Sequence, residues 1–189
     1  IDVSAFLNCT SLKSIVIPNG VETIDISTFK GCTSLQSVTL PKNDKFTSIG
    51  ASMFKDCSAL VDITIPDSVK TIYGYAFENC TSLKSITIPD GVTTVSESAF
   101  KGCTALSLSN IVLPDSTNTI YTSAFEGCSS LTSISIPEGN TGIGSAVYKD
   151  CTALTSVTIP KTVSAISNDS FKNCKNLKTV YGVSGSYAE

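Results

Sequence analysis

The stretch LKSIVIPNGVETIDISTFKGC at residues 12–32 returns, with few changes, as LKSITIPDGVTTVSESAFKGC at residues 83–103. Both copies open on Leu, place two aliphatic residues just before a Pro, and end with an aromatic residue three places before a Cys. Self-similarity of this length is typical of a repeat array, in which every unit has the same structure. The rest of the chain can therefore be aligned on this unit.

Cysteines set the register of the alignment. Neighbouring cysteines are 23 or 25 residues apart, which is a period and not the irregular spacing of a disulfide framework. Repeat units start near the following residues: Cys9, Cys32, Cys57, Cys80, Cys103, Cys128, Cys151 and Cys174. The two longer intervals contain extra residues after Pro41 and between Leu106 and Ile111, where we expect loop insertions.

Each segment of the unit predicts a local structure. The Ile-x-Ile pair has the period of a strand, and the following Pro ends it because Pro cannot donate to a ladder. The Phe-x-x-Cys-x-x-Leu spacing predicts one short helical or 3₁₀ turn on the opposite side of the coil. One unit cannot enclose a core, whereas stacked units bury a continuous one and pair their strands in parallel. We therefore predict a repeat solenoid of roughly eight coils, each of about 23 residues.

These columns resemble the BspA-like class of leucine-rich repeats, which has the pattern L-x-x-I-x-I-P-x-x-V-x-x-I-x-x-x-A-F-x-x-C. The resemblance implies a leucine-rich-repeat solenoid over residues 1–180, and the closing YGVSGSYAE at 181–189 looks like the start of that family's C-terminal cap. The chain opens in the middle of a unit, so we expect it to be part of a longer protein. The resemblance also implies a secreted or cell-surface protein, of the kind implicated in adhesion.

Composition excludes several classes of function. The net charge is −3, and the 13 basic residues are scattered lysines, so nucleic acid is not the expected partner. The sequence holds neither a membrane-spanning apolar run nor any His, the commonest general base. We therefore expect a monomeric domain that is not an enzyme and that has no catalytic residues, metal or cofactor.

The cysteine column allows two interpretations. It could be a metal or redox array, or a stack of small buried thiols with one in each coil. Zinc sites need converging ligands at spacings such as C-x₂-C, and the sequence has none. Disulfides between neighbouring coils are sterically conceivable but would pair the thiols unevenly, so we predict free buried thiols.

Small polar residues occupy the outward positions of the predicted strands, where stacking would align them in two ladders. These candidate binding residues are Ser37, Thr39, Asp62, Thr64, Ser85, Thr87, Ser133, Ser135, Ser156 and Thr158. One interpretation is structural, because Thr favours strands and keeps an exposed face soluble. The other is a flat recognition face for a glycan, a matrix protein or ice.

Aromatic and inserted residues mark two further candidate binding regions. Tyr73 and Tyr121 occupy one column two coils apart, with Tyr75 nearby, while Lys42 and Lys45 lie in the first insertion. Exposed tyrosines can anchor a partner, although single exposed aromatics are also ordinary on protein surfaces.

Together, the family resemblance and these candidate surfaces lead us to expect a domain that binds an extracellular protein or glycan and mediates adhesion. The alternatives are a stalk that presents another domain and an intracellular scaffold, since reducing compartments tolerate free thiols.

Overall fold

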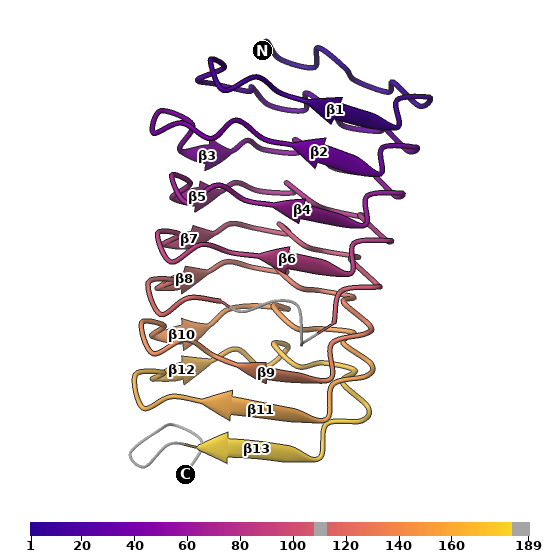
Figure 1. Cartoon of the computed structure of the whole chain (residues 1–189). Helices are drawn as coiled ribbons and strands as arrows, with labels where there is room; N and C mark the ends of the chain where they lie inside the picture. Colours follow the sequence, from indigo (N-terminus) through magenta and orange to yellow (C-terminus); the bar gives the residue numbers. More distant parts are fainter. Residues whose placement is uncertain (108–112, 183–189) are drawn as a thin grey trace.

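The computed structural model describes residues 1–107 and 113–182, which form a β-solenoid of about seven turns (Figure 1). Each coil lies directly against the one before it, and the two ends of the chain lie at opposite ends of the stack. The predicted repeat solenoid with parallel strands is confirmed. The eight cysteines bound seven complete coils, which accounts for the difference from the roughly eight predicted.

Two sets of short strands run along the stack. The first set contains the predicted Ile-x-Ile strands: β1 (Ser14–Val16), β2 (Ser37–Thr39), β4 (Asp62–Thr64), β6 (Ser85–Thr87), β9 (Ser133–Ser135), β11 (Ser156–Ile159) and β13 (Thr179–Gly182). The second set lies on another side of the coil: β3 (Ser48–Ile49), β5 (Thr71–Ile72), β7 (Thr94–Val95), β8 (Thr119–Ile120), β10 (Gly142–Ile143) and β12 (Ala165–Ile166). The sequence analysis predicted one strand per coil and missed this second set, because two-residue strands are too short to show an alternating pattern.

The expected helical or 3₁₀ turn is absent from the described residues, where the Phe-x-x-Cys-x-x-Leu segments form consecutive turns. In the coil of Phe29, the Cys32 N–H donates to the Phe29 carbonyl at 3.1 Å, and the Leu35 N–H donates to the Cys32 carbonyl at 3.0 Å. Ser27, two residues before Phe29, and Gly31, just before Cys32, have positive φ values of +55° and +74°. Left-handed residues reverse the chain direction and end each turn, so the three-residue spacing arises without a helix.

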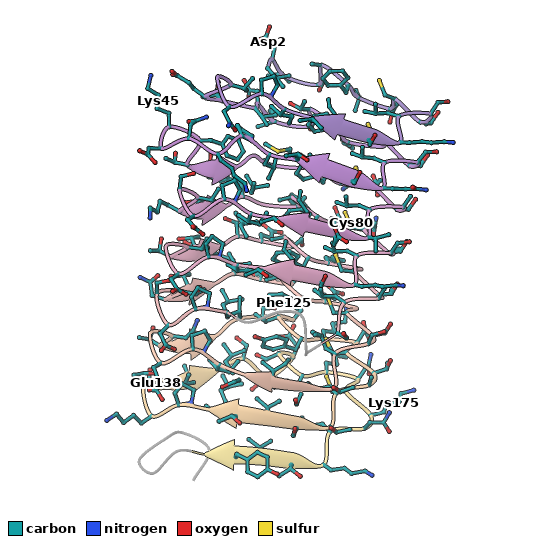
Figure 2. The ribbon with its side chains drawn as sticks, viewed as in Figure 1. Asp2, Lys45, Cys80, Phe125, Glu138 and Lys175 are labelled. Carbon is teal, nitrogen blue, oxygen red and sulfur yellow. The ribbon has the colours of Figure 1, made fainter. Side chains whose placement is uncertain are left out.

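The core is built from columns of equivalent residues, in which each coil contributes one residue from the same inward-facing position of the repeat. Leu83 and Cys80 are fully buried, as is Phe77, whose ring stacks between those of Phe54 and Phe100 with centroids 5.4 and 5.3 Å away. Figure 2 shows Cys80 and Phe125 inside the coils, whereas Lys45 extends from their outer edge. The aromatic stack continues from Phe6 to Phe171.

The first insertion forms the expected loop. The Asn43 side chain ties it to the preceding coil by donating to the carbonyls of Asn19 and Val21, at 2.8 and 2.9 Å. Phe46 then enters the core with 1% of its surface exposed, at the place that Val69 holds in the next coil. The second insertion, at residues 107–110, lies outside the described residues except for Ser107, and so do the strand position Ile111 and residues 183–189 of the expected cap.

Candidate binding surfaces

The first set of strands presents the predicted polar ladders, which we call the hydroxyl face and define by the outward residues of β2, β4, β6, β9 and β11. The register pairs Asp62 with Ser85 and Thr64 with Thr87, and farther along it pairs Ser133 with Ser156 and Ser135 with Thr158. Ser37 and Thr39 continue the same positions on β2, whose side chains there are exposed. The structure therefore aligns all ten predicted polar residues on one side of the solenoid.

The inserted loop borders this face. A shallow pocket of about 300 Å³ is lined on one side by Lys42 and Asp44 and on the other by Thr64. Lys45 points elsewhere, because its ammonium group forms an ion pair with Glu22 of the preceding coil. The structure thus joins Lys42 to the hydroxyl face and leaves Lys45 outside that pocket.

The tyrosines lie on the side of the second set of strands, away from the hydroxyl face. Tyr73 directly follows β5 and Tyr121 directly follows β8, and they expose 48% and 50% of their surface. Tyr75 donates a hydrogen bond to Glu97 Oε1 at 3.0 Å, and Lys55 Nζ lies 5.3 Å from the centroid of its ring. The tyrosines and the residues of the hydroxyl face thus lie on two separate surfaces, and Lys45 lies outside the pocket that borders the hydroxyl face.

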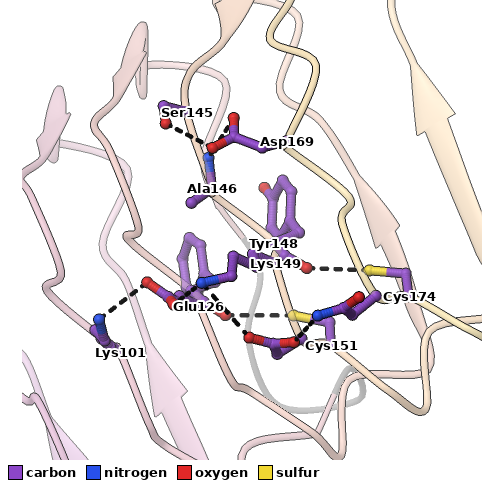
Figure 3. Close-up of polar contacts among 12 residues, drawn as sticks. Lys101, Glu126, Ser145, Ala146, Tyr148, Lys149, Cys151, Asp169 and Cys174 are labelled. Carbon is purple, nitrogen blue, oxygen red and sulfur yellow. Dashed lines mark hydrogen bonds and ion pairs between the residues drawn. The ribbon is translucent and has the colours of Figure 1, made fainter.

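A ladder of alternating charges, which the sequence analysis missed, runs two positions before the cysteines. Lys55 pairs with Glu78 at 2.5 Å, and Glu126 lies between Lys101 and Lys149, whose ammonium nitrogens are 3.0 and 2.9 Å from its two carboxylate oxygens (Figure 3). Burial tends to raise the pKa of Glu126, but the two lysines lower it to about 2. The alternation of Lys and Glu at the repeat period was the signal that could have revealed this ladder.

The cysteines line the core beside the aromatic stack, and all eight are free thiols. The buried interpretation is confirmed for six of them, whereas Cys9 is exposed and Cys174 is half-buried. Each thiol from Cys32 onward donates to the aromatic residue's carbonyl in the preceding coil, as Cys103 does to Phe77 at 3.1 Å. Burial raises the pKa of Cys57 to about 12 and that of Cys103 well above its ordinary value. Such thiols remain protonated and are poor nucleophiles or metal ligands.

Within residues 1–107 and 113–182, no group of three or more His, Cys, Asp or Glu side chains is placed to hold a metal ion. Those same residues include no helix with the length and apolar character to cross a membrane. A cavity of about 310 Å³ beside β9 is lined by apolar and aromatic residues that include Leu113, Phe125, Leu131 and Tyr148.

Comparison with known proteins identifies the repeats. Residues 1–107 and 104–185 match the model of BspA type leucine-rich repeat regions, in six copies. No curated protein matches the chain significantly. Among solved structures, a leucine-rich cell surface protein of Faecalibacterium prausnitzii is 29% identical with a TM-score of 0.65, and the match covers 98% of this chain and 63% of that one.

Two further structures are similar. A leucine-rich repeat protein of Bacteroides ovatus is 25% identical with a TM-score of 0.51, over 89% of this chain and 60% of that one. A leucine-rich repeat protein of T. pallidum, 24% identical with a TM-score of 0.63 over 94% and 71% of the two chains, shares the fold. The chain thus spans less than two thirds of the F. prausnitzii and B. ovatus proteins.

Proposed function

Because the chain belongs to the BspA-type leucine-rich repeat family, we propose that it is a non-enzymatic domain, displayed on a cell surface or secreted, that binds an extracellular protein or glycan and mediates adhesion. The similar F. prausnitzii protein is described as a cell surface protein, which supports this location. The lack of His and the small hydroxyl side chains that dominate the hydroxyl face support binding over catalysis.

The hydroxyl face is the observation that carries the proposal. Parallel pairing places equivalent outward residues about 5 Å apart from coil to coil, so Thr64 and Thr87 repeat the same contact along the axis. A partner that extends along the face would meet many weak and similar contacts. Copies of such a domain on one cell raise the overall affinity further by multivalency.

Adhesion of beads coated with the whole chain tests the proposal. We expect the beads to adhere to at least one surface in a panel of extracellular matrix proteins and glycans, and the triple variant Thr39→Ala/Thr64→Ala/Thr87→Ala to adhere at least tenfold less. The matched control is Thr33→Ala/Thr81→Ala/Thr104→Ala, which removes three exposed threonines from the turn edge after the cysteines.

The two alternatives predict different results. If the chain is only a stalk for another domain, the beads adhere to nothing in the panel, and that result contradicts the proposal. Equal adhesion of the triple variant and its control would also contradict the role of the hydroxyl face. An intracellular scaffold is tested separately, by asking where the protein lies in its own cells.

A further inference from the structure

The second set of strands is interrupted between β8 and β10, which belong to different sheets. After β5, β7, β8 and β12, the next residue donates its N–H to the preceding coil, as Tyr73 does to the Ile49 carbonyl and Tyr121 to the Val95 carbonyl, both at 3.0 Å. Gly144 follows β10 in the same way but makes no such bond to Ile120. One backbone donor and one backbone acceptor are thus left out of the ladder, and such groups need partners.

A groove of about 390 Å³ opens at this interruption. Its lining includes Ile120 and Gly144, the two residues on either side of the interruption. Gly142 and Ala165 leave the space open because their side chains are small or absent. The polar lining residues are all uncharged: Asn118, Thr119, Thr141 and Ser167. This groove suits a ligand that is polar and neutral.

Two exposed tyrosines, Tyr73 and Tyr121, lie on the same side of the solenoid as the groove, next to its lining residues rather than among them. Tyr121 follows Ile120 in the chain, and Tyr73 occupies the equivalent position two coils earlier. Ser96 occupies this position in the coil between them. Two coil spacings amount to about 10 Å. Each ring offers an apolar face and a hydroxyl group, a combination suited to partners that are partly apolar and partly polar.

We propose that this surface, the tyrosine groove (Tyr73, Ser96, Tyr121, Gly144 and Ser167), binds a neutral, β-1,4-linked hexose chain that lies along the solenoid axis. An extended chain of this kind repeats every second sugar, at nearly the spacing of the two tyrosines, so alternate sugars can place the same C–H face on each ring. Sugar hydroxyls can donate to the Ile120 carbonyl and accept from the Gly144 N–H. The tyrosine groove is separate from the hydroxyl face, so this inference adds a second binding surface and goes beyond the proposed function.

Calorimetric titration of the whole chain with cellohexaose and chitohexaose tests the inference. We expect at least one of these neutral hexasaccharides to bind, and Tyr73→Ala and Tyr121→Ala each to weaken binding about tenfold. Gly144→Ala also weakens it by narrowing the groove, and the fold has room for the added Cβ because the nearest atoms to it are 3.7 Å away. The matched control is Tyr181→Ala, which removes an exposed tyrosine from β13 and leaves binding unchanged. Circular dichroism verifies that each variant is folded.

The inference is wrong if the unaltered chain binds neither hexasaccharide, or if Tyr121→Ala binds as tightly as Tyr181→Ala. A second measurement separates this failure from failure of the proposed function. If neither hexasaccharide binds while coated beads still adhere to surfaces stripped of glycans, the glycan inference is overturned while adhesion stands. If the beads adhere to no surface and no hexasaccharide binds, both fail.

Discussion

The ring of Tyr148 stacks on that of Phe125 with the centroids 5.6 Å apart and the planes within 8° of parallel. The other seven residues of this column are Phe, so Tyr148 carries the one hydroxyl group in the stack. That hydroxyl is buried and has no hydrogen-bond partner among the described residues. The aromatic column thus tolerates a polar atom at the cost of leaving it unsatisfied.

Tyr148→Phe removes this unsatisfied group and keeps the ring. We expect the free energy of unfolding, measured by chemical denaturation, to rise by about 1 kcal/mol, since a buried polar group without a partner costs roughly that much or more. The reverse change in the neighbouring coil, Phe125→Tyr, is expected to lower it. A Tyr148→Phe variant that is less stable than the unaltered chain would show that the hydroxyl has a partner.

Glu126 forms ion pairs with one lysine in the preceding coil and one in the following coil. Because its pKa is low, its contribution to the free energy of unfolding depends on pH in a defined way. The folded pKa of about 2 lies below the ordinary value of 4.5, so the stabilisation is complete above pH 4.5 and is lost as the pH falls toward 2. Glu126→Gln is expected to lower the free energy of unfolding by about 1 kcal/mol at pH 7 and by less at pH 2. The exposed Glu138→Gln serves as the control, with little change expected at either pH. A Glu126→Gln effect that is the same at pH 7 and pH 2 would contradict this explanation.

Gly102 occupies one of the left-handed positions that end the turns. Its φ is +72°, and a Cβ added there would lie 2.6 Å from Asn79 Oδ1. Gly102→Ala is therefore expected to lower the free energy of unfolding by about 1–2 kcal/mol. At Gly20, no atom lies within 4 Å of an added Cβ, so Gly20→Ala should leave stability unchanged or raise it slightly. Equal effects of the two changes in thermal denaturation would refute the conformational argument.

Burial of the cysteines predicts their reactivity. In the native protein at pH 8, a thiol reagent is expected to modify Cys9 rapidly and Cys174 more slowly, while the six buried thiols react only in denaturant.

The buried thiols also predict how the stability of the fold depends on pH. Because folding raises the pKa of thiols such as Cys57 from 9.0 to about 12, their contribution to the free energy of unfolding is complete below pH 9 and is lost as the pH rises toward 12. Rapid reaction of all eight without denaturant, or a melting temperature that is constant from pH 8 to 11, would contradict the buried column.

Much of the fold follows from the sequence because a repeat presents the same evidence several times. One Phe-x-x-Cys segment fits several local structures, but the recurrence of Phe29, Phe54 and Phe77 in one column fixes the stacking. The turns were harder to predict, since a spacing of three residues fits both a helical turn and successive reverse turns. The decisive signal was the residue just before each Cys, always Asn, Asp or Gly, which are the residues that tolerate a positive φ.

The binding surfaces were predictable only in part. Alternation in the strands was enough to place Thr64 and Thr87 on one exposed face, because parallel stacking keeps equivalent residues together. The interruption beside Gly144 was not predictable, since its glycines fit the repeat columns and the loss of one backbone hydrogen bond leaves no trace in the sequence. The ion pairs of Glu126 were likewise not predictable, because they depend on the conformations that the long Lys and Glu side chains adopt between coils.

Location is the most direct test of the central claim that this is a surface-displayed adhesive domain. Intact source cells are treated with a protease, and peptides from residues 1–182 are sought in the released fraction, with a cytoplasmic protein monitored to verify that the cells have not lysed. We predict that these peptides are released from unlysed cells. If they appear only after lysis, the protein lies inside the cell, and the scaffold alternative replaces the adhesive one.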